Sequence, residues 1–204
     1  MPDRSKTRRS ILEAVVTCIE KYGIDKVTTR KIAVEAGTNL ASINYYFRSK
    51  ENLFLAVLEE SYAQIRKAER ALDLEHRDPR EALRRLVDFT WDYYLAHPEF
   101  LTLLNSENLH KGRHVRRSKR VRELHSPLVD TLRGILRRGE RDGLFRRGVD
   151  PVQLYISIAG EGYFYLSNRY TLSRIFGRDL MARRALAARE KHNGEMILNA
   201  LRAR

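Results

Sequence analysis

Short polar side chains gather around one glycine in the first quarter of the chain. Four of them follow Gly37 on what would be the outward side of a short helix: Thr38, Asn39, Ser42 and Asn44. Side chains of this size can reach base edges or phosphates of DNA without steric clash. Asparagine can also pair with adenine through two hydrogen bonds. The residue types therefore indicate recognition of nucleic acid.

Basic side chains flank this polar set. Arg30 and Lys31 precede the glycine, and Arg48 and Lys50 follow it. Cations at these positions suit contacts with the phosphate backbone, which place a protein on the duplex without reading its sequence. The whole chain carries 39 Lys and Arg against 26 Asp and Glu, a formal net charge of +13. This surplus favours a polyanionic partner, with nucleic acid ahead of a membrane surface.

Two short helices joined by a tight turn would position these side chains. Thr28 or Thr29 can cap a helix over TTRKIAVEAG, and Asn39 opens another over LASINYYF. Gly37 suits a turn residue with positive φ, and the small Ala33 lies four residues before it. The apolar contacts between the two helices would come from Ile32, Ala36 and Ile43. The pattern predicts a helix-turn-helix, whose second helix enters the major groove.

The rest of the chain has the pattern of longer helices. We expect them over 79–98, 99–110, from Ser126-Pro127 to about 142, over 152–170 and over 178–201. No strand-like alternation is sustained, and no internal repeat is present. The sequence therefore predicts an all-α fold of about nine helices.

Several classes of protein fit the sequence poorly. The single cysteine, Cys18, excludes an intramolecular disulfide and a thiolate metal cluster within one chain. The charged N-terminus leads into no signal-peptide core, and no apolar run approaches the ~20 residues of a membrane helix. We expect a soluble, cytoplasmic protein without a cofactor.

One set of residues has partial metal-ligand spacing. Glu107, His110 and His114 fall at i, i+3 and i+7, one face of a helix that could hold zinc or nickel. Gly112 lies between the two histidines and would break that helix. We therefore expect a basic turn here rather than a metal site.

Residues from about 8 to 58 closely resemble the DNA-binding domain of TetR/AcrR-family regulators. The resemblance rests on ILEAVVTCIEKYGIDKVTTRKIAVEAG and on SINYYFRSKENLFLAVL. In such proteins the threonine that opens the second helix contacts phosphate, here Thr28 with Thr29 and Arg30 beside it. The lysine that opens the fourth helix, here Lys50, does the same. The third helix reads bases, which corresponds here to Thr38, Asn39, Ser42, Asn44 and Tyr45.

The chain departs from the family pattern at two positions of this motif. Thr38 stands where the family usually has an apolar residue, and Asn44 stands where it usually has tyrosine. We expect Tyr45 to take over the tyrosine–phosphate contact, which leaves Asn44 to read a base. Tyr46 and Phe47 are expected to pad the joint with the fourth helix.

The resemblance also implies an organisation for the whole chain. Residues 1–52 would form a three-helix DNA-binding domain, and residues 53–204 a larger helical domain for ligand binding and dimerisation. The last two helices would pair with their mates in a homodimer that faces a palindromic operator on double-stranded DNA. A small-molecule effector would release the repressor from that operator, the usual mode of the family.

The ligand pocket would lie among the fourth to eighth helices. Candidate lining residues are Phe89, Tyr93, Phe100, Leu104, Glu107, Asn108 and Tyr163. Trp91 reads as a core residue. Glu107 and Glu161 lie in apolar helices, where a buried carboxylate needs a partner. That partner would be either a structural ion pair or hydrogen bond, or the ligand.

Two other functions compete with this interpretation. An architectural DNA binder would have no cavity and little sequence preference. A helical enzyme would need a nucleophile elbow, a phosphate loop or a dense acid/base cluster, and none is visible in the sequence. We therefore expect a regulator that is not an enzyme.

Overall fold

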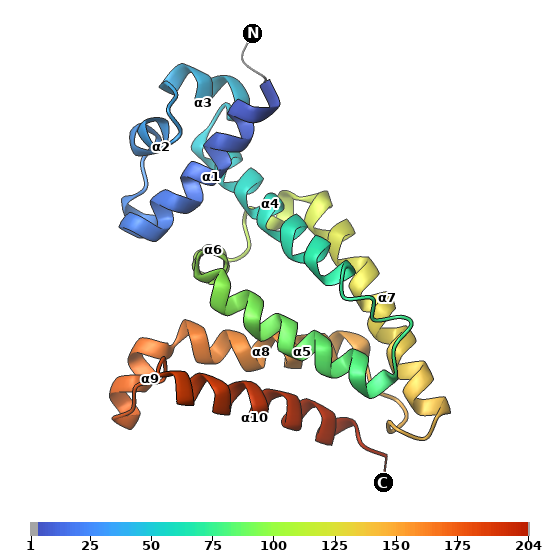
Figure 1. Cartoon of the computed structure of the whole chain (residues 1–204). Helices are drawn as coiled ribbons and strands as arrows, with labels where there is room; N and C mark the ends of the chain where they lie inside the picture. The colour runs from blue at the N-terminus through green and yellow to red at the C-terminus, as the bar shows by residue number, and fades with distance from the viewer. Residues whose placement is uncertain (1–3, 204) are drawn as a thin grey trace. The chain divides into compact units, whose positions relative to one another are not determined.

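The structure is a computed structural model that describes residues 4–203, apart from the side chains of residues 125 and 126. Within this range it contains ten α-helices, two short 3₁₀ helices and no β-strand (Figure 1). The expected all-α fold is confirmed. The additional helix arises because the segment expected over 152–170 divides at Asn168 into α8 (Pro151–Ser167) and α9 (Arg169–Phe176).

The backbone contacts divide the chain into two compact units. The first unit runs to Gln64 and also includes Pro98–Arg122. Its elements are α1 (Arg4–Tyr22), η1 (Ile24–Lys26), α2 (Thr29–Glu35), α3 (Leu40–Phe47), most of α4 (Lys50–Arg70), α6 (Pro98–Leu109) and η2 (Val115–Arg117). The boundary of this unit is a boundary of contacts, so the functional division after residue 52 stays a prediction.

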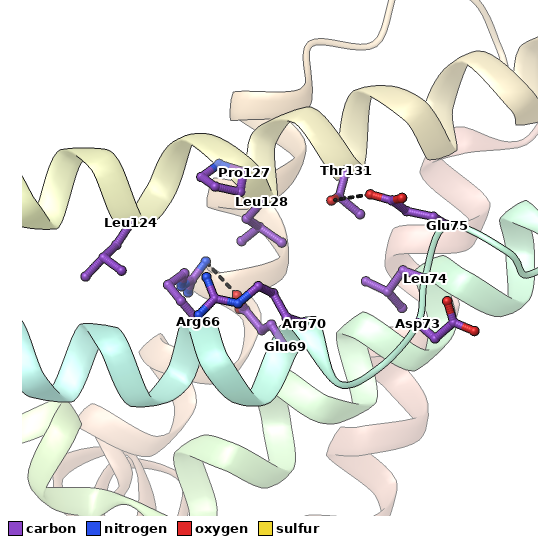
Figure 2. Close-up of a pocket in the computed structure, with 10 residues that line it drawn as sticks. All are labelled: Arg66, Glu69, Arg70, Asp73, Leu74, Glu75, Leu124, Pro127, Leu128 and Thr131. Atoms are coloured by element: carbon purple, nitrogen blue, oxygen red, sulfur yellow. Dashed lines mark hydrogen bonds and ion pairs between the residues drawn. The ribbon is translucent and has the colours of Figure 1, made fainter.

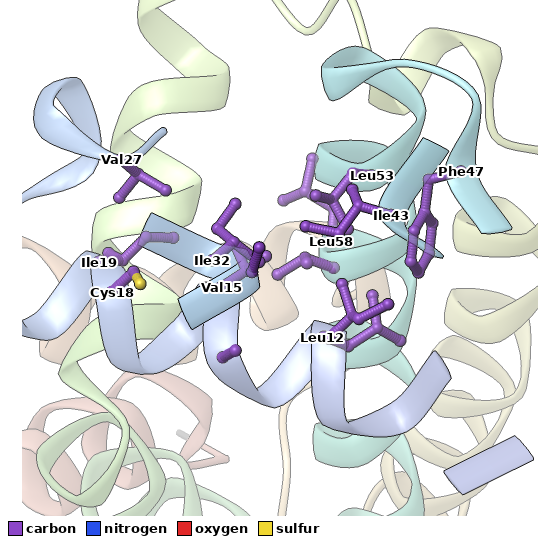
Figure 3. Close-up of a cluster of buried hydrophobic side chains, with 14 of the residues drawn as sticks. Leu12, Val15, Cys18, Ile19, Val27, Ile32, Ile43, Phe47, Leu53 and Leu58 are labelled. Carbon is purple, nitrogen blue, oxygen red and sulfur yellow. The ribbon is translucent and has the colours of Figure 1, made fainter. Parts of the chain in front are cut away.

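One apolar core holds the first unit together (Figure 3). Val15 and Ile19 repeat at helical spacing on α1 and lie in this core. Ile32 from α2, Ile43 from α3 and Leu58 from α4 contribute to the same cluster. Because all of these side chains are almost completely buried, the short helices α2 and α3 are held in a fixed geometry.

The second unit comprises Ile65–His97 and Glu123–Arg204. It contains α5 (Pro79–Ala96), most of α7 (Lys119–Arg141), α8, α9 and α10 (Arg183–Leu201). Helices α5, α8 and α10 pack against one another. Gly162 of α8 is buried, and a Cβ there would lie 3.2 Å from the ring of Tyr94 on α5. This glycine therefore serves close packing of two helices within the chain.

Helix α7 differs from the expected helix. It begins at Lys119, and Pro127 lies inside it rather than at its start. Ser118 explains the earlier start, because its Oγ accepts a hydrogen bond from the Val121 N–H (3.1 Å) and thereby caps the first turn. The basic stretch is thus partly helical, and Ser118 Oγ also donates to Glu59 of α4 (2.5 Å).

Candidate nucleic-acid interface and ligand pocket

The turn between α2 and α3 has the geometry that its residues predict. The Thr28 hydroxyl accepts a hydrogen bond from the Lys31 N–H (3.3 Å) and caps α2. Asn39 Oδ1 accepts from the Ser42 N–H (2.8 Å) and caps α3. Gly37 lies between them with φ 60°, a conformation that side chains rarely adopt. Both helix starts and the turn are therefore fixed by local interactions.

Helix α3 has a buried and an exposed side. Ile43 and Phe47 point into the core of the first unit, whereas Asn44 and Tyr45 are exposed. The side chain of Tyr45 is 66% exposed and makes an edge-to-face contact with the half-buried Tyr46 (5.1 Å between ring centroids). Phe47 thus lies in the core and Tyr46 packs against it, whereas the Tyr45 ring is exposed. The contact of Tyr45 with phosphate stays a prediction.

One exposed residue near the start of α3 was not among those predicted to contact DNA. Leu40 is 45% exposed at the first position of the helix, close in sequence to Thr38 and Ser42. An apolar side chain at such a place suits contact with a thymine methyl group. The only signal in the sequence is its place directly after the N-cap Asn39, between the polar residues Thr38 and Ser42.

The cations around the motif play different parts. Arg30 is exposed in the first turn of α2, next to the half-buried Thr29. Lys50 is the first residue of α4, and its Nζ donates to the Val27 carbonyl (3.1 Å). Lys31 instead donates to the Lys26 carbonyl (3.0 Å) and lies over the ring of Tyr22 (4.2 Å). Lys31 therefore has a structural role that its position in the sequence did not indicate.

Four of the predicted ligand-binding residues belong to α6 in the first unit. Phe100 is buried and makes an edge-to-face contact with Tyr62 (5.5 Å), while Leu104 is half-buried. Asn108 is exposed and donates through Nδ2 to the Leu104 carbonyl (2.9 Å). Glu107 is buried and faces the turn after α6.

Glu107 holds that turn through several hydrogen bonds. Its Oε1 accepts from the backbone N–H groups of His114 (2.7 Å) and Val115 (2.9 Å). Its Oε2 lies 2.6 Å from His114 Nδ1. Burial by itself would raise the pKa of the Glu107 carboxyl, but these hydrogen bonds outweigh it, and the pKa lies below its usual value. The buried carboxylate therefore has structural partners from its own unit.

The other three predicted ligand-binding residues belong to the second unit. Phe89 and Tyr93 on α5 are half-buried and in ring contact (5.7 Å), and Tyr163 on α8 is also half-buried. Trp91 is buried, as expected for a core residue. Glu161 forms an ion pair with Arg189 of α10.

A pocket of about 300 Å³ lies within the second unit, between the end of α4 and α7 (Figure 2). Its lining residues are Arg66, Glu69, Arg70, Asp73, Leu74, Glu75, Leu124, Pro127, Leu128 and Thr131. None of the seven predicted ligand-binding residues is among them. The predictions favoured aromatic residues, whereas this pocket combines leucines with charged side chains.

Two charged residues of the pocket wall are almost completely buried. Arg66 is 3% exposed and Glu69 is 6% exposed. Arg66 Nη1 lies 2.8 Å from Glu69 Oε2, but the contact lacks hydrogen-bonding geometry, and Arg66 Nε, Arg66 Nη1 and Glu69 Oε2 have no hydrogen-bond partner in the described chain. Arg66 Nη2 lies 3.5 Å from the Tyr155 hydroxyl of α8. Desolvation raises the pKa of Glu69 to about 7, although the nearby Arg66 lowers it.

No helix in the described part of the chain is long and apolar enough to span a membrane.

Family models match both halves of the chain. Residues 11–57 match the model of bacterial regulatory proteins of the tetR family, and residues 79–197 match the tetracyclin repressor-like C-terminal domain. The chain is 43% identical to the HTH-type transcriptional repressor NicS of Pseudomonas putida over 197 residues. That alignment covers 97% of this chain and 93% of NicS.

Solved structures share the fold over nearly the whole chain. A transcriptional regulator from Saccharomonospora viridis in complex with choline has a TM-score of 0.72 at 23% identity, with 98% of this chain and 100% of that chain covered. The regulator FadR from Bacillus subtilis in complex with stearoyl-CoA has a TM-score of 0.69 at 18% identity, with 95% and 98% covered. The chain therefore belongs to the TetR family of bacterial regulatory proteins and is a DNA-binding transcriptional regulator rather than an enzyme.

Proposed function

We propose that this regulator is a homodimeric repressor that binds a palindromic operator through α3 and leaves it when a small molecule binds. The exposed face of α3 carries the proposal. Asn44 and Tyr45 are exposed on a helix whose opposite side is buried in the core, next to a capped turn. A rigid helix with an outward polar face suits reading of the major groove.

The contacts with DNA divide into two kinds. Phosphate contacts are assigned to Tyr45 and to the helix starts: Thr28, Thr29, Arg30 and Lys50. Base reading is assigned to Thr38, Asn39, Ser42 and Asn44. Because Asn39 Oδ1 already accepts the capping hydrogen bond, Asn44 is the stronger candidate for direct readout of adenine.

Dimerisation is assigned to the last two long helices, α8 and α10. Helix α8 exposes Val152, Ile156 and Phe164, and α10 exposes Met196. Exposed apolar side chains on neighbouring helices are typical of an interface between protein chains. A twofold dimer would present two copies of α3 about 34 Å apart, one turn of DNA, to a palindromic site.

One helix belongs to both units and supplies a route for the ligand response. Helix α4 begins with Lys50 and ends with pocket residues Arg66, Glu69 and Arg70. A ligand that binds one conformation of the pocket more tightly than the other would shift the balance between conformations that differ in DNA affinity. The choline and stearoyl-CoA complexes of related folds have chemically different ligands, so the ligand of this chain has to be argued from its own side chains.

The first experiment selects bound sequences from a random duplex pool with the full-length protein and then compares two variants on the recovered site. Asn44→Ala is expected to weaken operator binding by about 1–3 kcal/mol and to relax one base position. Lys50→Ala is expected to weaken binding to all sequences and to reduce the slope of log affinity against log salt by about 1.

Arg80→Ala serves as the control, because it removes an exposed positive charge from α5, outside the surfaces assigned to DNA, ligand and dimer. It should leave both the affinity and the salt slope nearly unchanged. Recovery of no palindrome, or equal loss on all sequences after Asn44→Ala, would contradict base reading by α3.

A further inference from the structure

The wall of the pocket in the second unit holds an incompletely neutralised cation. Removing a guanidinium charge such as that of Arg66 from water is unfavourable unless hydrogen bonds and a counter-charge replace the lost hydration. Its Nε and Nη1 have no hydrogen-bond partner in the described chain, and its contact with Glu69 lacks hydrogen-bonding geometry. A buried arginine in this state is suited to accept an anionic group from outside.

We propose that this pocket binds a small organic carboxylate, whose carboxylate group contacts Arg66 and whose apolar body lies against the leucines of the pocket. The inference rests on the proposed function, in which a small molecule controls DNA binding. Arginine is the side chain best matched to carboxylates, because its planar guanidinium donates several charge-assisted hydrogen bonds.

The apolar part of the pocket sets the kind of body that fits. Leu74 from the connection after α4, and Leu124, Pro127 and Leu128 from α7, line the space beside the buried charges (Figure 2). A volume of about 300 Å³ is at the lower end for small-molecule sites. The pocket therefore suits a compact monocarboxylate with an aliphatic or aromatic body, not a long-chain lipid.

Glu69 makes the binding depend on pH. It faces Arg66 and Arg70 on its own helix and Tyr155 on α8, while the described lining residues of α7 carry no charge. Asp73 and Glu75 are exposed at the mouth. Ionised Glu69 competes with the ligand for Arg66, whereas protonated Glu69 does not. Since the pKa of Glu69 is raised to about 7, carboxylate binding should be accompanied by proton uptake.

The test measures binding of matched probes to the full-length protein by isothermal titration calorimetry. Benzoate and hexanoate are compared with benzamide and hexanamide, and with benzylamine and hexylamine, which have the same bodies but no charge or a positive one. We expect a carboxylate to bind at least tenfold more tightly than its amide. Its affinity should be about tenfold higher at pH 6 than at pH 8, because Glu69 is mostly protonated only at the lower pH.

Two substitutions then separate the contributions of Arg66 and Glu69 to ligand binding. Arg66→Gln should abolish the preference for carboxylates. Glu69→Gln should keep carboxylate binding and remove its pH dependence. If one variant is poorly folded because it strands a buried charge, Arg66→Gln/Glu69→Gln removes both charges and should bind all three probe classes with similar affinity. Lys67→Gln, which removes an exposed positive charge from the same helix outside the pocket lining, is the control.

Three outcomes would overturn the carboxylate site. In the first, neither carboxylate binds more tightly than its amide. In the second, the amines bind more tightly than the carboxylates, and Glu69→Gln abolishes amine binding. In the third, Arg66→Gln binds the carboxylates as tightly as the wild type does. Fluorescence anisotropy on operator DNA separates this failure from that of the proposed function. Carboxylate binding without release of DNA would keep the site and contradict ligand-controlled repression. Release by compounds that bind the double variant equally well would keep ligand control and contradict this site.

Discussion

Each of the two compact units buries a glutamate, and the surroundings of the two carboxylates are opposite. Glu107 in the first unit accepts two backbone hydrogen bonds and contacts His114, which lowers the pKa of its carboxyl. Glu69 in the second unit has an oxygen without a hydrogen-bond partner, and desolvation raises its pKa to about 7. Burial alone therefore does not define the role of an acid. A buried carboxylate whose hydrogen bonds are complete, such as Glu107, has a structural role. A buried carboxylate in a pocket wall with an oxygen that lacks a hydrogen bond, such as Glu69, indicates a site that can bind a ligand.

The largest effect on stability is expected at Glu107. Glu107→Ala leaves two backbone N–H groups and a histidine ring without their acceptor in a buried place. The free energy of unfolding should fall by about 3 kcal/mol, since each stranded polar group costs about 1–3 kcal/mol. Chemical denaturation at pH 7 measures this loss. Because the folded-state pKa is lowered, the part of this loss that comes from the carboxylate charge should be present at neutral pH and should diminish as the pH falls through that lowered pKa.

Asn108→Ala is the matched control for Glu107→Ala. It lies on the same helix, is exposed, and donates to a carbonyl of its own helix. Its substitution should change the free energy of unfolding by less than about 0.5 kcal/mol. Equal effects of the two substitutions would break the comparison, because Glu107 would then be no more structural than an exposed helical residue.

A smaller effect, with a distinct pH dependence, is expected at Glu69. A carboxyl whose folded-state pKa lies above its unfolded value binds a proton more tightly in the folded protein. Wild-type stability should therefore fall as pH rises from about 4.5 through 7, by roughly 2 kcal/mol between pH 5 and pH 8. Glu69→Gln cannot titrate and should lack this part of the slope.

Denaturation curves collected at several pH values provide the measurement, with Glu75→Gln as the control at an exposed position of the same pocket. The control should keep the wild-type slope. If Glu69→Gln also keeps it, the carboxyl of Glu69 is not held in a desolvated state, and the contrast with Glu107 fails.

The helix-turn-helix could be predicted because its signals are local. Thr28 and Asn39 cap α2 and α3, and Gly37 has the positive φ that its place in the turn requires. Each of these interactions spans three residues or fewer, so the sequence displays it directly. The start of α7 was predicted wrongly because Pro127 was given more weight than the cap at Ser118.

The pocket could not be predicted, because its burial comes from distant parts of the chain. Arg66 and Glu69 lie in the run QIRKAER, and a run with so many charges is typical of a solvated helix face. Their surroundings come from residues far away in sequence. Leu128 lines the same pocket, and the Tyr155 hydroxyl lies 3.5 Å from Arg66 Nη2. At Glu107 the sequence correctly indicated a buried acid in need of a partner. The partner proved to be the following turn, which composition does not reveal.

The smallest effect on stability is expected at a third glutamate, Glu161, which is more exposed than Glu107 and Glu69. Glu161 pairs with Arg189, and each side chain is about a quarter exposed. Arg189 also donates to the Glu161 carbonyl (2.9 Å) and keeps that bond when the carboxylate is removed. Glu161→Gln should therefore cost less than about 1 kcal/mol, and the loss should shrink as salt is added. A loss above about 2 kcal/mol that depends on protein concentration would show that the pair is buried between α8 and α10 of two chains. Glu161 would then have a structural role in the dimer, comparable with that of Glu107 within one unit.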